Sequence, residues 1–492
     1  MRDALLRLYR ELRGERPAAV VGVAGDGSQR TYHRLIARDG STSIGAFGPD
    51  PEENRAFLSF SRAFRGIGLP VPEIRAVDEA AGVWIEEDLG EVTLFAALDE
   101  ARARASGDFP ATILPLYRRV LELLPRFQVE GDAAVDYSVA HPRAAFDRQS
   151  ILWDLNYFKY HFLKLARIPF HEARLERDFD ALAGFLLEAP RDYFLYRDFQ
   201  SRNVMVREGE PWFIDYQGGR RGALQYDVAS LLYDAKADLP EAVRSELLAH
   251  YLDALAERID VDRAAFLRHY RGYVLIRIVQ AMGAYGYRGF FERKPRFLQS
   301  VPYAAGNIRR LIEEGLPVEL PELEDAFRRI VEEWAILPAA ADEGGGLTVH
   351  VHSFSYRRGY PEDVAGHGGG FVFDCRALPN PGRLEEYRAE TGRSESVVRF
   401  LEAEPGVVPF WDSVRTLADA QVETYRTRGF TSLSIAFGCT GGQHRSVYLA
   451  ERLARHLDSR FPDVRVRLVH REEPYWPAEA GRETATASTW MP

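Results

Sequence analysis

The chain has 492 residues and a formal net charge of −10, and 46% of its residues are hydrophobic. This length suggests two or three domains that each bury a core, and the composition excludes a collagen-like chain, a mostly disordered chain and a generic basic nucleic-acid binder. Two cysteines, Cys375 and Cys439, are too few for a disulfide scaffold or a cysteine-rich zinc module. Four of the 63 basic residues are lysines, and the first 158 residues contain none.

The N-terminal segment 1–17 is rich in Arg, Leu and Glu, which predicts an amphipathic helix and not the apolar core of a signal peptide. No apolar run reaches the roughly 18 residues that a membrane-spanning helix needs. We therefore expect a cytoplasmic protein without a membrane partner.

A β-rich region follows this first helix. Segments 18–24 and 30–37 flank a Gly-Asp-Gly-Ser turn and alternate like the two strands of a hairpin. Pro51 and the two glutamates after it predict the start of a helix. Further strands are expected at 41–47, 74–77 and 83–87.

From about residue 93 the pattern is mostly helical, with a compact loop-and-strand region at 193–217. A small β-rich half joined to a larger helical half is the organisation of a two-lobed kinase, by analogy alone. The Ala/Gly-rich stretch near 337–346 predicts a linker, and alternating strands and helices follow it. Helices are expected at 110–129, 141–167, 173–187 and within 226–335.

The predicted fold class is an α+β two-lobed protein-kinase-like domain followed by a separate α/β domain. The predicted boundaries are a kinase domain at 1–335 (small lobe about 1–89, large lobe about 90–335), a linker at 336–346, an α/β domain at 347–472 and a flexible tail at 473–492.

The strongest signal in the first domain is YRDFQSRN at 196–203, followed by the apolar strand and aspartate FID at 213–215. An Asp followed five residues later by Asn is the spacing of a kinase catalytic loop. One carboxylate accepts the proton of the attacking hydroxyl, while an amide oxygen and a second carboxylate hold Mg²⁺. Asp198, Asn203 and Asp215 match these three roles. Turn residues that cap short strands are the structural alternative.

This segment resembles the aminoglycoside phosphotransferase and choline kinase-like family, closest in style to bacterial sugar kinases that phosphorylate the anomeric hydroxyl of N-acetylmuramate or N-acetylglucosamine. The resemblance implies an ATP-dependent and Mg²⁺-dependent kinase with Asp198 as catalytic base and Asn203 and Asp215 as metal ligands. Asp227 resembles the family's structural aspartate, which we expect to cap its helix or to orient the loop. Tyr196 and Gln200 stand where the family usually has histidines.

A second departure from the family concerns the nucleotide. The resemblance implies a strand lysine on the ATP phosphates, and this lobe has no lysine. Arg30, Arg34 or Arg38 is expected to supply the positive charge, together with backbone N–H groups of the glycine turn. The predicted nucleotide-binding residues are Gly25, Gly27, Ser28, Arg30, the helix glutamate Glu53, and Glu87 within a hinge at 86–89.

The second domain contains the strand 432–437, then the loop GCTGGQHRS at 438–446 and a helix. A strand, a glycine-bearing loop and a helix N-terminus form an anion cradle, to which Arg445 and His444 are expected to add donors. The same residues satisfy Cys-x₅-Arg-Ser, the phosphate loop of cysteine-dependent phosphatases, with Cys439 as nucleophile. That alternative stays open at this stage.

Together with FVFDCRALPNPG at 371–382 and HSFSYRRGYP at 352–361, this loop resembles the C-terminal domain of the RapZ family of RNase adapters. The resemblance implies a domain that binds an amino-sugar phosphate and can contact small RNA. Arg358 replaces a family histidine, and the family's P-loop motif is absent from the sequence. RNA is weakly supported, because segment 347–472 is nearly neutral. The implied ligand-binding residues are Arg376, Cys439, Thr440, Gly441, Gly442, His444, Arg445 and Ser446.

The sequence therefore predicts an ATP-dependent small-molecule kinase that acts on an amino sugar. It is fused to a domain that binds a phosphorylated sugar, either to sense the product or to regulate the kinase. The alternative from another class is a non-catalytic regulator with a degenerate kinase lobe and an RNA-binding C-terminal domain.

Overall fold

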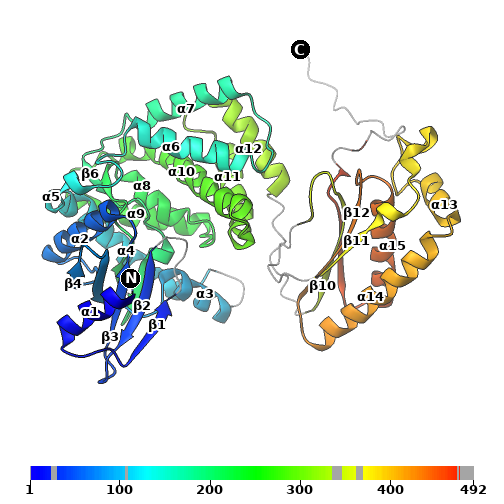
Figure 1. Ribbon diagram of the computed structural model, residues 1–492. Helices are drawn as coiled ribbons and strands as arrows, with labels where there is room; N and C mark the ends of the chain where they lie inside the picture. Colours follow the sequence, from blue (N-terminus) through cyan, green and yellow to red (C-terminus); the bar gives the residue numbers. More distant parts are fainter. Residues whose placement is uncertain are drawn as a thin grey trace, which may run out of the picture. The chain divides into compact units, whose positions relative to one another are not determined.

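The computed structural model describes residues 2–23, 30–105, 109–334, 346–361, 370–473 and 476. The chain divides into two compact units, Met1–Leu337 and Pro338–Pro492, which are considered separately (Figure 1). None of the helices in the described ranges combines the length and apolar character needed to cross a bilayer.

The first unit begins with a five-stranded antiparallel sheet in the order β1-β2-β3-β5-β4. The predicted hairpin is confirmed, because Ala19 of β1 pairs with Ile36 of β2. Leu5 and Leu8 of α1 are buried with Leu35 in a small apolar cluster on this sheet. The bounds are α1 Arg2–Arg13, β1 Ala19–Val23, β2 Thr31–Ile36, β3 Thr42–Phe47, β4 Ile74–Asp78 and β5 Val83–Glu87.

Helix α2 (Pro51–Gly66) joins this sheet to the rest of the unit. It begins at Asp50, whose carboxylate accepts the N–H of Glu53 at 3.2 Å and so satisfies one of the unpaired donors of the first turn. Phe57 stacks on Tyr216 with ring centroids 5.3 Å apart. The helix is therefore packed against a loop of the larger lobe.

The larger lobe is built around α10, which packs against α6, α7, α8 and α11 in one continuous apolar core. Two short antiparallel sheets, β6 with β9 and β7 with β8, present its loops. The helices are α3 Leu94–Arg104, α4 Leu114–Pro125, α5 Gly131–Ala134, α6 Arg148–Phe158, α7 Glu172–Leu186, α8 Gln225–Leu232, α9 Glu241–Ala256, α10 Arg263–Gly286, α11 Val301–Glu313 and α12 Pro321–Trp334. The strands are β6 Tyr193–Leu195, β7 Val204–Arg207, β8 Glu210–Phe213 and β9 Arg220–Gly222.

The helix predicted at 141–167 is shorter at its start. It begins at Arg148, because the Asp147 carboxylate accepts the N–H of Ser150 at 3.0 Å and caps it there. Pro142 also lacks a backbone N–H and disfavours the helical conformation of the residue before it.

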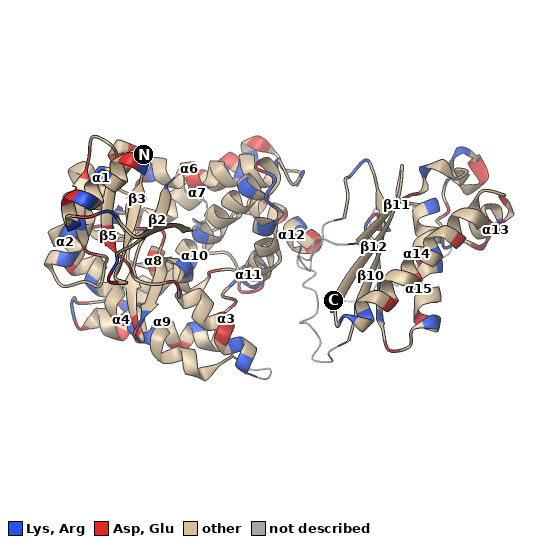
Figure 2. Ribbon diagram, turned by 60° about the horizontal axis from the view of Figure 1, so that its bottom comes forward, with Lys and Arg blue, Asp and Glu red and all other residues tan. Residues whose placement is uncertain are grey.

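The second unit contains a parallel sheet in the order β11-β12-β10-β13. Val349 and Val351 of β10 and Ile435 of β12 are buried beneath α14 and α15, which lie beside this sheet in Figure 1. Acidic and basic residues are interspersed along the helices of both units (Figure 2). The bounds are β10 Thr348–Ser355, β11 Gly370–Asp374, α13 Glu395–Ala403, α14 Val407–Thr427, β12 Ser432–Cys439, α15 Arg445–Arg460 and β13 Arg465–His470.

Candidate functional site

The loop after β6 is held in shape by a buried carboxylate. Asp227 of α8 accepts the backbone N–H of Tyr196 at 2.8 Å and that of Arg197 at 3.0 Å. Arg197 has a φ of 83°, a conformation that a non-glycine residue keeps only when its surroundings impose it. The expectation that Asp227 orients the loop is confirmed, because both N–H groups belong to the residues directly before Asp198.

The three residues that the spacing singled out lie together. The Asn203 side-chain amide donates to the Asp198 carbonyl at 2.9 Å and to Oδ2 of Asp215 at 3.0 Å. Gln217 donates to the other oxygen of Asp215 at 2.7 Å. One amide thus connects the loop of Asp198 to the aspartate that follows β8.

Asp215 lies in a buried and negatively charged environment. Burial, and then the negative charge of Asp198, raises the pKa of Asp215. Among the residues that the structure describes, no Arg, Lys or His forms an ion pair with this carboxylate. Carboxylate and amide oxygens are the protein ligands that Mg²⁺ prefers, so Asp215 and Asn203 fit that ion.

Arg30 lies on the small-lobe side of this group. It is 4% exposed, and its guanidinium pairs with the Glu53 carboxylate at 3.3 Å. The same guanidinium lies over the rings of Phe57 and Trp84, at 5.2 and 5.5 Å from their centroids. The positively charged guanidinium of Arg30 therefore lies between α2 and β5, in a lobe that contains no lysine.

The second unit holds the predicted anion cradle between β12 and α15. Cys439 is buried, and its Sγ accepts the N–H of Gly442 at 3.2 Å and lies 3.1 Å from Oγ of Ser446. The carbonyl of Thr440 accepts a hydrogen bond from Ser355 Oγ at 2.8 Å. These contacts fix the loop at both ends and bring it beside the end of β10.

Comparison with known proteins decides the family. Residues 19–267, about half of the chain, match the family model of the phosphotransferase enzyme family. The chain belongs to the phosphotransferase enzyme family. Residues 347–474 match the RapZ C-terminal domain. The predicted fold class, a kinase-like domain followed by a separate RapZ-type α/β domain, is confirmed.

The chain spans about half the length of the curated relatives it matches. A nucleotide-binding protein of Ruegeria pomeroyi is 41% identical over 146 residues, which are 30% of this chain and 48% of that protein. A nucleotide-binding protein of Xanthomonas campestris pv. campestris is 40% identical over 147 residues, with coverages of 30% and 48%.

Similar solved structures include amicoumacin kinase hAmiN in complex with AMP-PNP, Ca²⁺ and Ami, at 13% identity and a TM-score of 0.40, covering 67% of this chain and 92% of that one. Choline kinase LicA from Streptococcus pneumoniae has 15% identity and a TM-score of 0.41, with coverages of 62% and 99%.

Two arginines predicted to serve the nucleotide of this phosphotransferase domain have other partners. Arg34 makes two hydrogen bonds to Asp88, at 2.6 and 3.2 Å, and so braces the segment after β5. Arg38 is exposed and pairs with Glu15, just after α1, at 3.6 Å. Of the three arginines, Arg30 is the one beside Glu53. Gly25, Gly27 and Ser28 lie outside the described residues.

Two neighbouring glutamates of β5 have different environments. Glu87, the predicted hinge residue, pairs with Arg207 of β7 at 2.6 Å. Glu86 is buried and accepts the indole N–H of Trp84 at 2.7 Å. Burial raises the pKa of Glu86 to about 7, so its neutral form is favoured in the folded protein.

This environment predicts a pH-dependent stability. Because burial raises the pKa of Glu86 in the folded protein from the ordinary 4.5 to about 7, the stability that its neutral carboxyl contributes is present below pH 4.5 and is lost as the pH rises through about 7. The loss amounts to about 3 kcal/mol at most. We expect Glu86→Gln, which stays neutral, to lose less unfolding free energy than the wild type between pH 5 and pH 8 in urea titrations. Glu87→Gln is the matched control and should keep the wild-type difference.

Three side chains predicted to bind the anion in the RapZ-type domain contact other groups. Arg445 is buried and donates through Nη1 to the carbonyls of Arg376 at 3.0 Å and Leu378 at 2.9 Å. His444 bonds through Nε2 to the carbonyl of Tyr387 at 2.9 Å. Arg376 itself pairs with the neighbouring Asp374 at 2.6 Å. All three side chains therefore have partners within the protein in this structure.

A buried carboxylate that no sequence motif singles out lies against the loop. Glu472 is 4% exposed, accepts the N–H of Ser355 at 3.2 Å and pairs with Arg358 at 3.2 Å. Glu472 follows the loop by some thirty residues, and no motif spacing connects the two.

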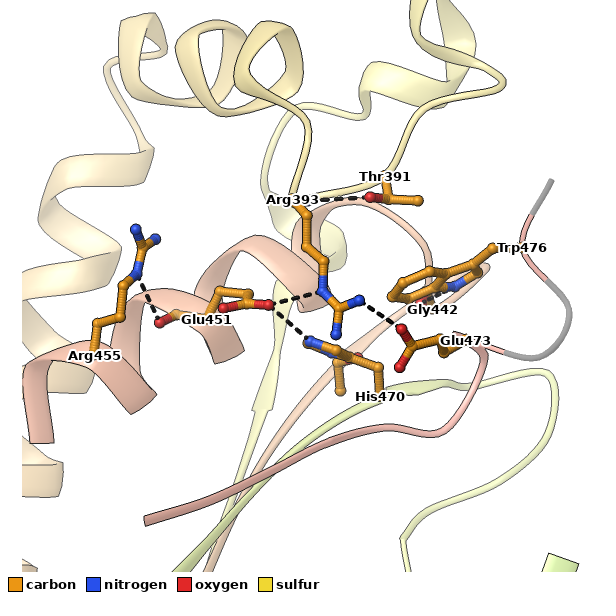
Figure 3. Close-up of polar contacts among 9 residues, drawn as sticks. Thr391, Arg393, Gly442, Glu451, Arg455, His470, Glu473 and Trp476 are labelled. Carbon is orange, nitrogen blue, oxygen red and sulfur yellow. Dashed lines mark hydrogen bonds and ion pairs between the residues drawn. The ribbon is translucent and has the colours of Figure 1, made fainter. Parts of the chain in front are cut away.

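The segment that contains Glu472 continues to contact the loop. Trp476 donates its indole N–H to the Gly442 carbonyl at 3.3 Å (Figure 3). Arg393 donates to the Glu473 carboxylate at 2.5 Å and to the Glu451 carboxylate of α15 at 2.8 Å, and so connects the two. The predicted flexible tail is therefore anchored at its start, since Glu473 and Trp476 both have partners. Residues 477–492 lie outside the described part.

The position of Gly442 predicts that a larger residue there would destabilise the RapZ-type domain. The φ of Gly442 is +67°, and an alanine Cβ would lie 2.2 Å from Cγ of Glu472. We expect Gly442→Ala to lower the unfolding free energy of the RapZ-type domain by roughly 1–3 kcal/mol in urea titrations of the full chain. Gly441→Ala is the matched control, because its Cβ would meet nothing within 4 Å. Equal stability of the two variants would contradict the contact.

Proposed function

We propose that the first domain transfers the γ-phosphoryl group of ATP to a hydroxyl of a small molecule, an amino sugar of the N-acetylmuramate or N-acetylglucosamine type. The observation that carries this proposal is the Asn203 amide, which connects the Asp198 loop to Asp215. This arrangement is the division of labour that phosphoryl transfer requires.

In this proposal Asp198 accepts the proton of the attacking hydroxyl. Its loop is fixed by Asp227, so the carboxylate keeps one position while the acceptor binds. Asn203 and Asp215 would hold Mg²⁺, which neutralises phosphate charge when bound. The Arg30 guanidinium takes the role of the missing strand lysine and is held by Glu53.

A substrate screen tests the proposal. The full chain is incubated with ATP, Mg²⁺ and a panel of amino sugars and neutral sugars, and ADP release is followed by a coupled assay. We expect release with at least one amino sugar and none with the Asp198→Asn protein. Nucleotide binding without turnover for every acceptor would instead favour the non-catalytic regulator.

For the RapZ-type domain we propose binding of a phosphorylated sugar at 438–446. The proposed limits are 1–335 for the kinase domain, 336–346 for the linker and 347–472 for the RapZ-type domain. The backbone N–H groups of a strand–loop–helix turn support this ligand class. Calorimetric titration of the full chain with glucosamine 6-phosphate tests it, with unphosphorylated glucosamine as control. Equal heats for the two sugars would exclude phosphate recognition.

A further inference from the structure

Two buried arginines of the larger lobe form no ion pair with any described carboxylate. Arg220 of β9 is 6% exposed, and Arg277 of α10 is 7% exposed. In the part of the chain that the structure describes, neither forms an ion pair with a carboxylate. By contrast, the nearby Arg197 makes two hydrogen bonds to the Asp154 carboxylate, at 2.7 and 2.6 Å.

The hydrogen bonds of the two arginines go to neutral groups. Arg220 donates through Nε to the Gly218 carbonyl at 2.9 Å. Arg277 donates to the side chain of Gln280 and, at 3.4 Å, to the hydroxyl of Tyr226. The Nε of Arg277 is buried without a hydrogen-bond partner. These hydrogen bonds bring no negative charge to either guanidinium, and the carboxylates of Asp154 and Asp198 act on Arg220 without forming an ion pair with it.

Both arginines lie near the proposed catalytic base. A Cβ placed on Gly218 would be 3.7 Å from Oδ2 of Asp198, and Arg220 is bonded to the carbonyl of this same glycine. Arg220 also pairs across the strands with Leu195, three residues before Asp198. The charge of Asp198 acts on both Arg220 and Arg277.

Burying a charge without an ion-pair partner costs free energy, and a guanidinium cannot avoid this cost by releasing its proton at neutral pH. Burial, and then the nearby Arg197 cation, lowers the pKa of Arg220 to about 10, which still leaves Arg220 protonated at pH 7. An oxyanion, and in particular a carboxylate or phosphate, matches the planar guanidinium with two parallel hydrogen bonds.

The charges around the site separate its two sides. Asp215 is influenced by Asp198 and by two small-lobe residues, Arg30 and Glu53, which are proposed to serve the nucleotide. Arg220 is influenced by Asp198 and by large-lobe residues, with neither Arg30 nor Glu53 among them. Arg220 is bonded to the carbonyl of Gly218, where an added Cβ would lie 3.7 Å from Oδ2 of Asp198, so its guanidinium belongs to the large-lobe surroundings of the proposed base.

We propose that the acceptor carries an anionic group, a carboxylate or a phosphate, and that Arg220 binds this group with support from the charge of Arg277. This inference rests on the proposed kinase function and specifies its substrate class. It makes Arg220 a specificity-determining residue that distinguishes charged from neutral acceptors of the same size.

The first measurement uses the full chain with Mg²⁺ and AMP-PNP, so that binding is read without turnover. The probes are N-acetylmuramate and its methyl ester, which differ in a single negative charge, and inorganic sulfate as a probe without a sugar. We expect the wild type to bind the acid about tenfold more tightly than the ester, and sulfate to raise its thermal unfolding temperature.

Arg220→Gln should bring the acid-to-ester ratio close to one and remove the sulfate effect. Arg221→Gln is the matched control, because the neighbouring Arg221 side chain is 52% exposed. Its substitution should leave both the acid-to-ester ratio and the sulfate effect in place. Arg220→Lys, which keeps the charge and loses the planar fork, should keep part of the preference. Unfolding temperatures without ligand identify any variant that fails to fold.

Three outcomes would overturn the inference. In the first, the wild type binds acid and ester equally and its unfolding temperature does not respond to sulfate. In the second, Arg220→Gln behaves as the wild type does. In the third, with ATP, Arg220→Gln lowers kcat for the acid and for the ester by the same factor. The last result would assign Arg220 to the transferred phosphoryl group. Preferential binding of the acid without any ADP release would support the inference and contradict the kinase function.

Discussion

Replacing Asp198 with Asn is expected to lower kcat for phosphoryl transfer by about 10²–10⁴-fold, because the acceptor hydroxyl loses the group that takes its proton. The backbone carbonyl of Asp198, which accepts the Asn203 amide, is unchanged by this substitution. The affinity for AMP-PNP with Mg²⁺ should therefore change little. Steady-state kinetics and calorimetric nucleotide binding on the same preparation give both values.

Asp192→Asn is the matched control, because Asp192 precedes β6 and is exposed. It should retain wild-type kcat. A fall in kcat of the same size in both variants would point to a general effect of charge on the lobe. Full activity of Asp198→Asn would remove Asp198 from the role of base.

Replacing Arg30 with Met is expected to raise KM for ATP by roughly 10–100-fold, the loss of about 1.5–3 kcal/mol that a hydrogen bond to a charged group contributes. The substitution removes the cation beside Asp215 and leaves the Glu53 carboxylate without this partner. Arg30→Lys should recover part of the loss, because an ammonium also binds phosphate, although as a point charge. Initial rates over a range of ATP concentrations measure the effect.

Arg38→Met is the control, since Arg38 is exposed and pairs with Glu15. Because Arg30 is packed over Phe57 and Trp84, its loss also affects packing, and thermal unfolding of each variant separates the two effects. A destabilised Arg30→Met protein with unchanged KM for ATP would mean that Arg30 supports the core and not the nucleotide.

Sequence reasoning works best where function confines several residues to a short stretch. The spacing of Asp198, Asn203 and Asp215 predicted that they lie together, and a single amide connects them. Strand alternation located the hairpin of β1 and β2, and the glycine-bearing turn before α15 located the loop of the second domain. In each case a local pattern sets the local structure.

Long-range pairing is where such reasoning fails. Nothing in the sequence distinguishes Arg30 from Arg34, and the difference arises because Asp88, more than fifty residues on, binds Arg34. Glu472 reaches the 438–446 loop for the same reason, through a contact between distant segments. That Arg220 forms no ion pair with a carboxylate among the described residues is equally invisible in the sequence, because it depends on how the fold orients the acidic residues near it.

The missing lysines acquire a structural explanation within this account. The small lobe contains arginines but no lysine. Arg30 is buried there, pairs with Glu53 and lowers the pKa of Asp215 through its positive charge. A guanidinium stays charged when buried, whereas a buried ammonium readily loses its proton. Arginine is thus suited to a cation site enclosed by Phe57 and Trp84.

The most direct test of the central claim is to follow the label of γ-labelled ATP into an acceptor. The full chain is incubated with labelled ATP, Mg²⁺ and each amino sugar, and the products are separated and identified by mass spectrometry. The account predicts that label appears on the sugar with the wild type and is absent with Asp198→Asn. Label found only in free phosphate, or transfer at equal rates by both proteins, would contradict it.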